Sequence, residues 1–286
     1  MKLVLGTVQF GLNYGINNSN GKPSLDNTFS ILNKAYQLGI NELDTADAYG
    51  NSTEVLFEYL TKNSDKNFAI MSKFVGNGNI TFEEAFENSC KKLGVNHLEG
   101  YYFHRFEDFK TFSNFDYIHK LKSLGRLNKF AVSLYSLEEL EVAANSTEVD
   151  LIQLPFNIFD RSKEKIDLLK KAKANNKKIY ARSAFLQGLF FKDVNSLPLK
   201  LIPLKDSLVE LHKILETYNV SIEDLCLNFV EGQDYIDKVI IGVDSVDQLE
   251  KNVKSLNQKL PEDLVQKVLS IKINNQELLN PVNWNI

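Results

Sequence analysis

Short apolar runs alternate along the chain with longer stretches in which apolar residues recur every three or four positions. Several of the runs are almost entirely apolar, which is typical of strands buried on both faces of a parallel sheet. The predicted strands are Leu3–Leu5, Glu42–Thr45, Phe68–Lys73, Gly100–His104, Lys129–Ser133, Leu151–Leu154, Lys178–Arg182 and Val239–Gly242.

The stretches between these runs have the spacing of helices that bury one face. Two positions mark helix ends, because Ser136 suits an N-cap and Gly39 suits the residue after a last turn. The predicted helices cover Asn27–Leu38, Thr81–Leu93, Ile118–Leu124, Glu138–Val142, Ser162–Ala174, Lys205–Tyr218, Ser221–Val230 and Val246–Val253.

The order of these elements favours an α/β fold, a single (β/α)8 TIM barrel over residues 1–286. No linker rich in Pro, Gly or Ser divides the chain. An open doubly wound sheet is the alternative, but it usually carries a G-x-G-x-x-G turn after its first strand. The segment Gly6-Thr7-Val8-Gln9-Phe10-Gly11 lacks that motif. A barrel would place a functional site at the C-terminal ends of its strands.

The charge of the chain excludes one class of partner. The 33 basic and 37 acidic residues give a formal net charge of −4 and are spread along the sequence. Proteins that bind nucleic acid usually carry a basic cluster. No such cluster stands out, so we expect no nucleic-acid partner.

Cysteines and apolar segments indicate the compartment. Cys90 and Cys226 lie far apart without partners at metal-ligand spacing, so we expect small buried thiols, no metal site and no disulfide framework. No apolar stretch approaches the roughly 20 residues that a membrane span needs. The segment Met1–Phe10 lacks the features of a signal peptide. These features predict a soluble cytoplasmic protein without a membrane partner.

Polar side chains stand where three consecutive predicted strands end. Asp44, Lys73 and His104 occupy these positions, and Tyr49 follows Asp44 by five residues. In a barrel these side chains would converge at the mouth.

This combination suits proton transfer to a reducible carbonyl. A free tyrosine titrates near ~10, too high for an efficient acid at neutral pH. The ammonium of Lys73 should therefore lower the pKa of Tyr49, and Asp44 should hold Lys73 charged. His104 could orient the carbonyl oxygen as a hydrogen-bond donor.

The segment Asp44-Thr45-Ala46-Asp47-Ala48-Tyr49-Gly50 resembles the D-T-A-x-x-Y-G signature of the aldo-keto reductase family, and Lys73 and His104 fall where its lysine and histidine do. The resemblance implies that Tyr49 is the general acid, Lys73 its pKa modulator, Asp44 the partner of the lysine and His104 the residue that orients the carbonyl. It also implies a small-molecule carbonyl substrate, NADPH or NADH as cofactor, and a monomer or small homo-oligomer.

The cofactor residues follow from the same resemblance. Ser133 and Gln153 match the positions that hold the carboxamide, with Leu134 where Asn is usual, and Arg182 stands where many members carry an aromatic residue. Arg182 could stack under a nicotinamide or instead pair with Asp160. The cofactor-binding residues predicted in this way are Gly6, Thr7, Ser133, Gln153, Arg182, Ser183, Gln187, Gly188, Gly242, Asp244, Gln248 and Asn252.

The last predicted strand leads into a segment that resembles the one gripping the adenosine end. Members that prefer NADPH often carry Lys or Arg first in this segment, whereas this chain has Asp244 and Gln248, with Lys251 as the basic residue. A carboxylate repels a 2′-phosphate and accepts hydrogen bonds from a free ribose. We expect weakened discrimination in favour of NADPH.

The substrate pocket is expected to be lined by Phe10, Tyr14, Arg105, Phe106 and Asn157 beside Tyr49, with Trp284 near its opening. Arg105 and Asn157 suggest a polar or anionic substrate such as a sugar derivative. The run Gln153-Leu154-Pro155-Phe156-Asn157 resembles a bacterial subgroup associated with polysaccharide biosynthesis. Two other functions stay open, a Schiff-base aldolase that uses Lys73 and a non-catalytic barrel that binds nicotinamide.

Overall fold

The computed structural model describes residues 2–76, 80–256 and 258–284. Its parallel strands hydrogen-bond in chain order, and β8 pairs with β1 to close a barrel. The predicted (β/α)8 fold is therefore confirmed, and the alternative of an open sheet is wrong. The strands are β1 (Leu3–Gly6), β2 (Glu42–Asp44), β3 (Ala69–Phe74), β4 (Leu98–Phe103), β5 (Leu127–Ser133), β6 (Leu151–Pro155), β7 (Lys178–Arg182) and β8 (Lys238–Ile241).

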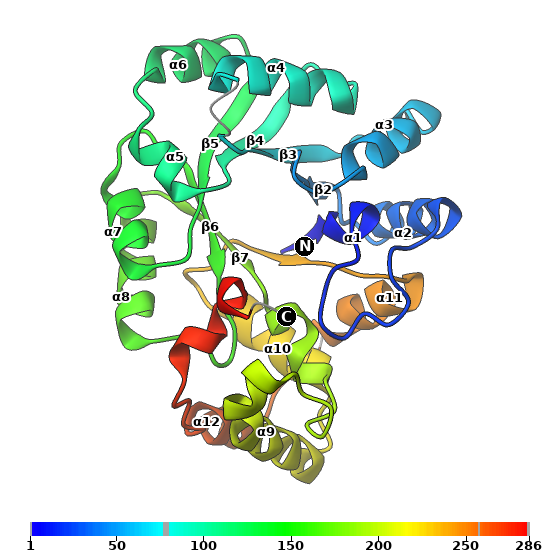
Figure 1. The fold of residues 1–286 in the computed structure, drawn as a ribbon, viewed down its shortest axis with the longest axis vertical. Helices are drawn as coiled ribbons and strands as arrows, with labels where there is room; N and C mark the ends of the chain where they lie inside the picture. The colour runs from blue at the N-terminus through cyan, green and yellow to red at the C-terminus, as the bar shows by residue number, and fades with distance from the viewer. Residues whose placement is uncertain (1, 77–79, 257, 285–286) are drawn as a thin grey trace.

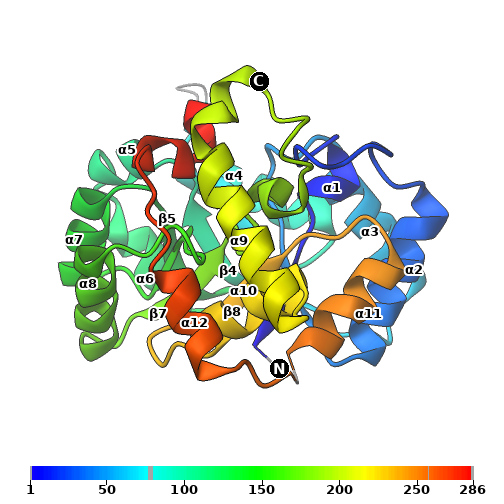
Figure 2. The same ribbon diagram turned by 90° about the horizontal axis from the view of Figure 1, so that it is seen from below.

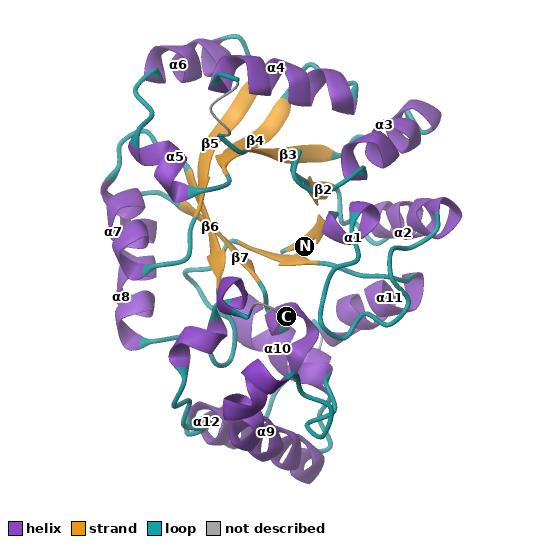
Figure 3. Ribbon diagram, viewed as in Figure 1, coloured by secondary structure: helices purple, strands orange, loops and turns teal. Residues whose placement is uncertain are grey.

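Helices surround the ring of strands (Figures 1 and 3). Where the chain returns to its start, α11 packs beside α2, and α12 lies along α9 (Figure 2). The helices are α1 (Val8–Gly11), α2 (Leu25–Gln37), α3 (Ser52–Lys62), α4 (Phe82–Leu93), α5 (Phe106–Lys110), α6 (Phe115–Ser123), α7 (Leu137–Asn145), α8 (Lys163–Ala174), α9 (Lys205–Tyr218), α10 (Ile222–Glu231), α11 (Val246–Ser255) and α12 (Glu262–Leu269). Short 3₁₀ turns are η1 (Leu186–Phe191), η2 (Leu199–Leu204), η3 (Gln276–Leu279) and η4 (Pro281–Asn283).

The helix-end signals in the sequence act as predicted. The hydroxyl of Ser136 accepts a hydrogen bond from the backbone of Glu139, whose side chain bonds back to the cap. Gly39 has a φ of +79°, which favours glycine after α2. Such caps satisfy amide groups that lack partners inside the helix.

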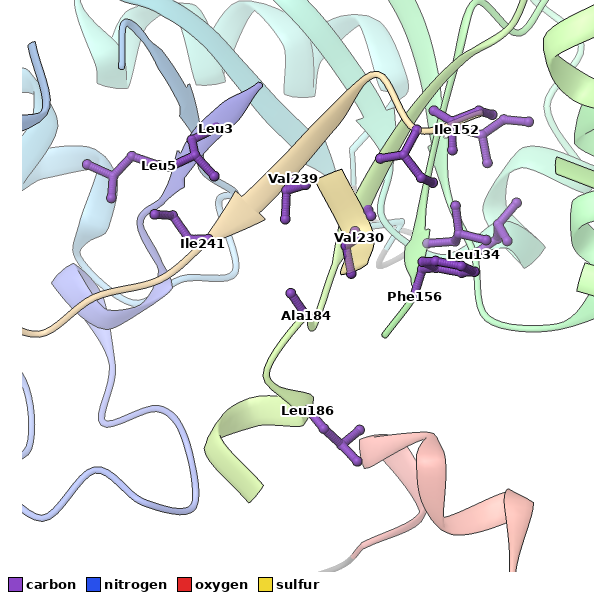
Figure 4. Close-up of a cluster of buried hydrophobic side chains, with 14 of the residues drawn as sticks. Leu3, Leu5, Leu134, Ile152, Phe156, Ala184, Leu186, Val230, Val239 and Ile241 are labelled. Carbon is purple, nitrogen blue, oxygen red and sulfur yellow. The ribbon is translucent and has the colours of Figure 1, made fainter. Parts of the chain in front are cut away.

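The core has two layers. The larger one lies between strands and helices, and Figure 4 shows Leu3 and Leu5 of β1 beside Val239 and Ile241 of β8 in it. The smaller layer fills the barrel, and its members are Val4, Met71, Tyr102, Ala131, Leu151, Tyr180 and Ile240.

Alternation along the strands extends this inner layer toward the mouth, because side chains two positions apart share a face. Two residues beyond Met71, Leu151 and Tyr180 stand Lys73, Gln153 and Arg182, which are polar. A polar layer therefore covers the apolar interior at the C-terminal ends of the strands.

Two further features of the described residues are the state of the cysteines and the length and apolarity of the helices. Cys90 and Cys226 are buried free thiols, as predicted. In residues 2–76, 80–256 and 258–284, no helix is long and apolar enough to cross a membrane.

Candidate active site at the barrel mouth

A buried ion pair lies at the mouth of the barrel. The Nζ of Lys73 donates to Asp44 Oδ2 at 2.5 Å and to the carbonyl oxygen of Thr45 at 2.9 Å. Gln153 donates from Nε2 to Asp44 Oδ1 at 2.8 Å. The side chain of Lys73 is 0% exposed, so this pair is shielded from water. Both carboxylate oxygens of Asp44 are thus engaged, which fixes the lysine in place.

The ring of Tyr49 lies against this pair. Its centroid is 4.8 Å from Lys73 Nζ. The imidazole of His104, directly after β4, meets the same ring edge-on at a centroid distance of 5.9 Å. The structure therefore brings together the four residues that the sequence predicted at the strand ends.

The pKa of Tyr49 moves opposite to our expectation. Burial raises it above the usual value of tyrosine, the charge of Asp44 raises it further, and the charge of Arg182 acts in the lowering direction. The expectation of a lowered pKa is wrong for this state, because burial and the charge of Asp44 raise it. The phenol is protonated at neutral pH, and its raised pKa makes it a weaker acid in this state than a free tyrosine.

His104 is neutral at physiological pH. Burial, followed by the charges of Lys73 and Arg182, lowers its pKa to about 3. Its Nδ1 is buried without a hydrogen-bond partner among the described residues. An uncharged imidazole can donate one hydrogen bond to a ligand oxygen.

Close backbone packing holds the turn that presents Tyr49. A Cβ on Gly11, at the end of α1, would lie 1.7 Å from the carbonyl oxygen of Tyr49. Gly50 has a φ of +55°, and a Cβ there would lie 2.4 Å from the carbonyl oxygen of Gly11. Glycine is required at both positions, because a side chain at either would separate α1 from the turn.

A cavity of about 400 Å³ opens beside Tyr49, which is within the usual size of ligand sites. Asp44 and Tyr49 line it, whereas Lys73 and His104 are not among its lining residues. Most of the predicted cofactor-binding residues also line it: Gly6, Gln153, Arg182, Ser183, Gln187, Gly188, Gly242, Asp244, Gln248 and Asn252.

Two residues predicted to bind cofactor do not line the cavity. Thr7 is buried, donates to the carbonyl oxygen of Asp44 and accepts from the hydroxyl of Ser52. Ser133 is buried at the end of β5. Thr7 therefore supports the loop after β1 as a structural residue.

The predicted substrate residues need correction, because of that set only Tyr14 lines the cavity. Phe10 and Phe106 belong to the outer core. Arg105 forms a salt bridge with Asp108 at 3.0 Å. Asn157 donates to the carbonyl oxygen of Ser183. These four side chains therefore pack or form polar contacts within the fold and do not line the cavity.

Trp284 is also placed differently from the prediction. It is buried, and its indole donates to the carbonyl oxygen of Leu278 instead of facing the cavity.

Several lining residues were not predicted from the sequence, namely Val8, Gln9, Gly15, Asn17, Asn18, Phe191 and Glu223. They come from segments far apart in the chain, so no local spacing revealed them. A hydrogen bond joins two segments that line the cavity, since the amide of Ile16, between Gly15 and Asn17, donates to the carbonyl oxygen of Gln187 at 3.1 Å. Asn27 further ties α2 to the carbonyl oxygen of Asp244 at 2.8 Å.

The cavity is suited to a polar ligand with many hydrogen-bonding groups. The Oε1 atom of Gln9 is buried without a partner among the described residues. The amide group of Gln9 packs over Gly242, where a Cβ would lie 2.1 Å from Nε2. Acceptors and donors thus lie along the cavity from β2 to α11, which fits a dinucleotide.

The chain is similar to known proteins of one family. Residues 2–273 match the model of the aldo/keto reductase family. An uncharacterized oxidoreductase of Bacillus subtilis (strain 168), YqkF, is 23% identical over 269 residues, covering 84% of this chain and 86% of the relative. The aldo-keto reductase str7 of Strobilurus tenacellus is 24% identical over 271 residues, covering 85% and 80%.

Solved structures agree on the fold. Two structures from Pseudomonas aeruginosa, each assigned as an aldo-keto reductase, superpose with TM-scores of 0.66 and 0.65 at 22% and 21% identity. The first comparison covers 89% of both chains, and the second covers 93% of this chain and 90% of the other.

Proposed function

This chain belongs to the aldo/keto reductase family, and from that premise we propose that it reduces an aldehyde or ketone to an alcohol with NADH or NADPH. The observation that carries the proposal is the phenol of Tyr49 on the cavity wall, against the buried pair of Lys73 and Asp44. A reduced nicotinamide held by the residues along the cavity would supply a hydride to the carbonyl carbon.

Tyr49 gives its proton to the carbonyl oxygen in this proposal. Burial keeps the hydroxyl protonated until a substrate accepts the proton, since it raises the pKa of Tyr49. Transfer leaves a phenolate, and the positive charges of Lys73 and Arg182 favour that form. Asp44 and Gln153 hold Lys73 at the ring, so the charge is already in position when it is needed.

His104 orients the carbonyl oxygen. As a neutral imidazole beside the Tyr49 ring, it can donate a hydrogen bond without adding charge to the mouth. The oxygen would then lie where Tyr49 can give it a proton, so the substrate would be held in a reactive geometry.

The surroundings of Lys73 argue against the aldolase alternative. A Schiff base requires a free amine that meets the substrate, and the Nζ of Lys73 is buried between Asp44 and the carbonyl oxygen of Thr45. Lys73 is also not among the residues that line the cavity. We therefore assign it an electrostatic role.

Oxidation of NADH and NADPH against a panel of aldehydes, ketones and oxidised sugars tests the proposal. We expect turnover with at least one class of carbonyl. The decrease in absorbance of the reduced nicotinamide measures it. Tight binding of both cofactors without turnover on any carbonyl would instead indicate a non-catalytic nicotinamide-binding barrel. Oxidised sugars stay in the panel, although the two relatives give no support to the polysaccharide-associated subgroup.

A second expected result concerns the choice of cofactor. Asp244, Glu223 and Lys251 line the cavity, and the two carboxylates would oppose an added phosphate. We expect NADPH to have no strong advantage in kcat/KM, and Asp244→Asn to shift the ratio of Kd values toward NADPH by about tenfold, about 1.4 kcal/mol of lost repulsion. Fluorescence titration with both reduced cofactors measures the shift.

Asp247→Asn is the matched control, because this acidic residue of α11 does not line the cavity. It should leave the ratio of Kd values unchanged. A wild-type preference for NADPH of about a hundredfold or more would refute the cofactor proposal.

A further inference from the structure

Arg182 brings a second positive charge to the mouth of the barrel. It is the last residue of β7 and stands two positions after Tyr180, whose side chain is part of the inner core layer. The alternation of side chains along a strand therefore directs Arg182 into the barrel mouth. Arg182 lines the cavity together with Tyr14 and Tyr49.

The contacts of Arg182 hold it in place without neutralising it. Its guanidinium carbon lies 4.2 Å from the ring centroid of Tyr135, and Nη2 donates to the carbonyl oxygen of Leu134 at 3.4 Å. The sequence suggested Asp160 as an alternative partner, but Asp160 pairs with Lys165. Across residues 2–76, 80–256 and 258–284, no carboxylate forms a salt bridge with Arg182.

The other cation of the mouth is already balanced, because Lys73 lies against Asp44 at 2.5 Å. The charge of Arg182 reaches the reacting groups. Burial is the main influence on the pKa values of Tyr14, Tyr49 and His104, and in all three cases Arg182 acts in the lowering direction.

A partly buried cation without a counter-charge is costly unless a ligand supplies the anion. The planar fork of a guanidinium matches the two oxygens of a carboxylate or phosphate. We propose that Arg182 binds a carboxylate or phosphate group of the substrate, so that the natural substrate is an anionic carbonyl compound. This inference rests on the proposed reductase function and names its substrate class.

Pairs of aldehydes that differ in charge test the proposal. 4-Carboxybenzaldehyde and methyl 4-formylbenzoate share a ring and differ in the charge of the para group, and glyceraldehyde 3-phosphate and glyceraldehyde form the phosphate pair. For at least one pair, we expect kcat/KM of the wild type to favour the anion by about tenfold or more, as for a hydrogen bond to a charged group. Arg182→Met should bring that ratio close to one, and Arg182→Lys should restore part of it.

Arg105→Met is the matched control. Arg105 directly follows His104 in the chain. Its guanidinium is bound by Asp108, and it does not line the cavity. The selectivity ratio should survive this change. Loss of the ratio in Arg105→Met with retention in Arg182→Met would overturn the assignment.

A cofactor phosphate is the other possible source of the anion, and titration of NADH into wild type and Arg182→Met separates the two. If Arg182→Met weakens NADH binding tenfold and leaves the anion selectivity intact, the guanidinium serves the cofactor and the proposal is overturned. Equal turnover of charged and neutral aldehydes by the wild type also overturns it, while the reductase function stands.

Absence of turnover on every aldehyde would refute the reductase function itself. Calorimetric binding of 4-(hydroxymethyl)benzoate, compared with 4-methylbenzyl alcohol, then still decides on Arg182. Preferential binding of the benzoate by the wild type and its loss in Arg182→Met would support an anion site. Equal binding of the two compounds by the wild type would contradict it.

Discussion

Replacing Tyr49 with phenylalanine is expected to lower kcat by about 10²–10⁴-fold, the usual contribution of a positioned acid. The ring that packs against Lys73 and His104 is retained, and no hydrogen bond of the Tyr49 hydroxyl is found among the described residues. The fold and the affinity for cofactor should therefore change little. Steady-state kinetics, thermal unfolding and fluorescence titration with the reduced cofactor measure the three quantities.

Tyr14→Phe is the control for this experiment. Tyr14 lines the same cavity, but the buried ammonium and imidazole pack against Tyr49. The loss of kcat in Tyr14→Phe should be smaller, within about tenfold. If Tyr49→Phe kept a tenth or more of the wild-type kcat, the proton would come from another group.

The change Lys73→Met should reduce both stability and activity. It leaves the carboxylate of Asp44 buried without its cation, and removal of one partner of a buried pair costs about 3–5 kcal/mol. Chemical denaturation at neutral pH measures this loss of free energy of unfolding. Loss of the charge beside Tyr49 should also lower kcat, because the phenolate left by proton transfer then lacks one of the two positive charges that favour it.

The double variant Asp44→Asn/Lys73→Met separates charge from packing. An asparagine at position 44 can still accept the hydrogen bond from Gln153 without a buried charge. The double variant should be more stable than Lys73→Met alone. Equal stability of the wild type and Lys73→Met would mean that the pair contributes nothing, and our electrostatic interpretation of the mouth would be wrong.

The barrel could be predicted because its strands are short apolar runs with a regular order. The bounds of β7 were predicted as the structure has them, and the other strands differ by one or two residues at their ends. Four helices were missed, α1, α3, α5 and α12. Helix α1 is too short for a periodic pattern, and α3 begins after Asn51, whose side chain makes no capping hydrogen bond. Missing caps remove the strongest local signal of a helix start.

The candidate site was predictable where strands carry it. Asp44, Lys73 and His104 follow from strand ends, since the barrel aligns those ends at one face. Loop residues gave no such guide. Arg105 was assigned to the pocket, although Asp108 three residues later offered a partner within the same turn. Gln9 and Glu223 were missed because only the three-dimensional fold brings them together.

The glycine contact between α1 and the turn after β2 links two tasks of the protein. Val8 and Gln9 of α1 form part of the cavity wall, and Gly11 at its end touches the backbone of Tyr49. No side chain separates the two backbones, so a displacement of that wall would also move the backbone of Tyr49. A ligand that displaced α1 on entering the cavity would therefore also reorient the phenol of Tyr49, so that ligand binding and orientation of this side chain would be coupled.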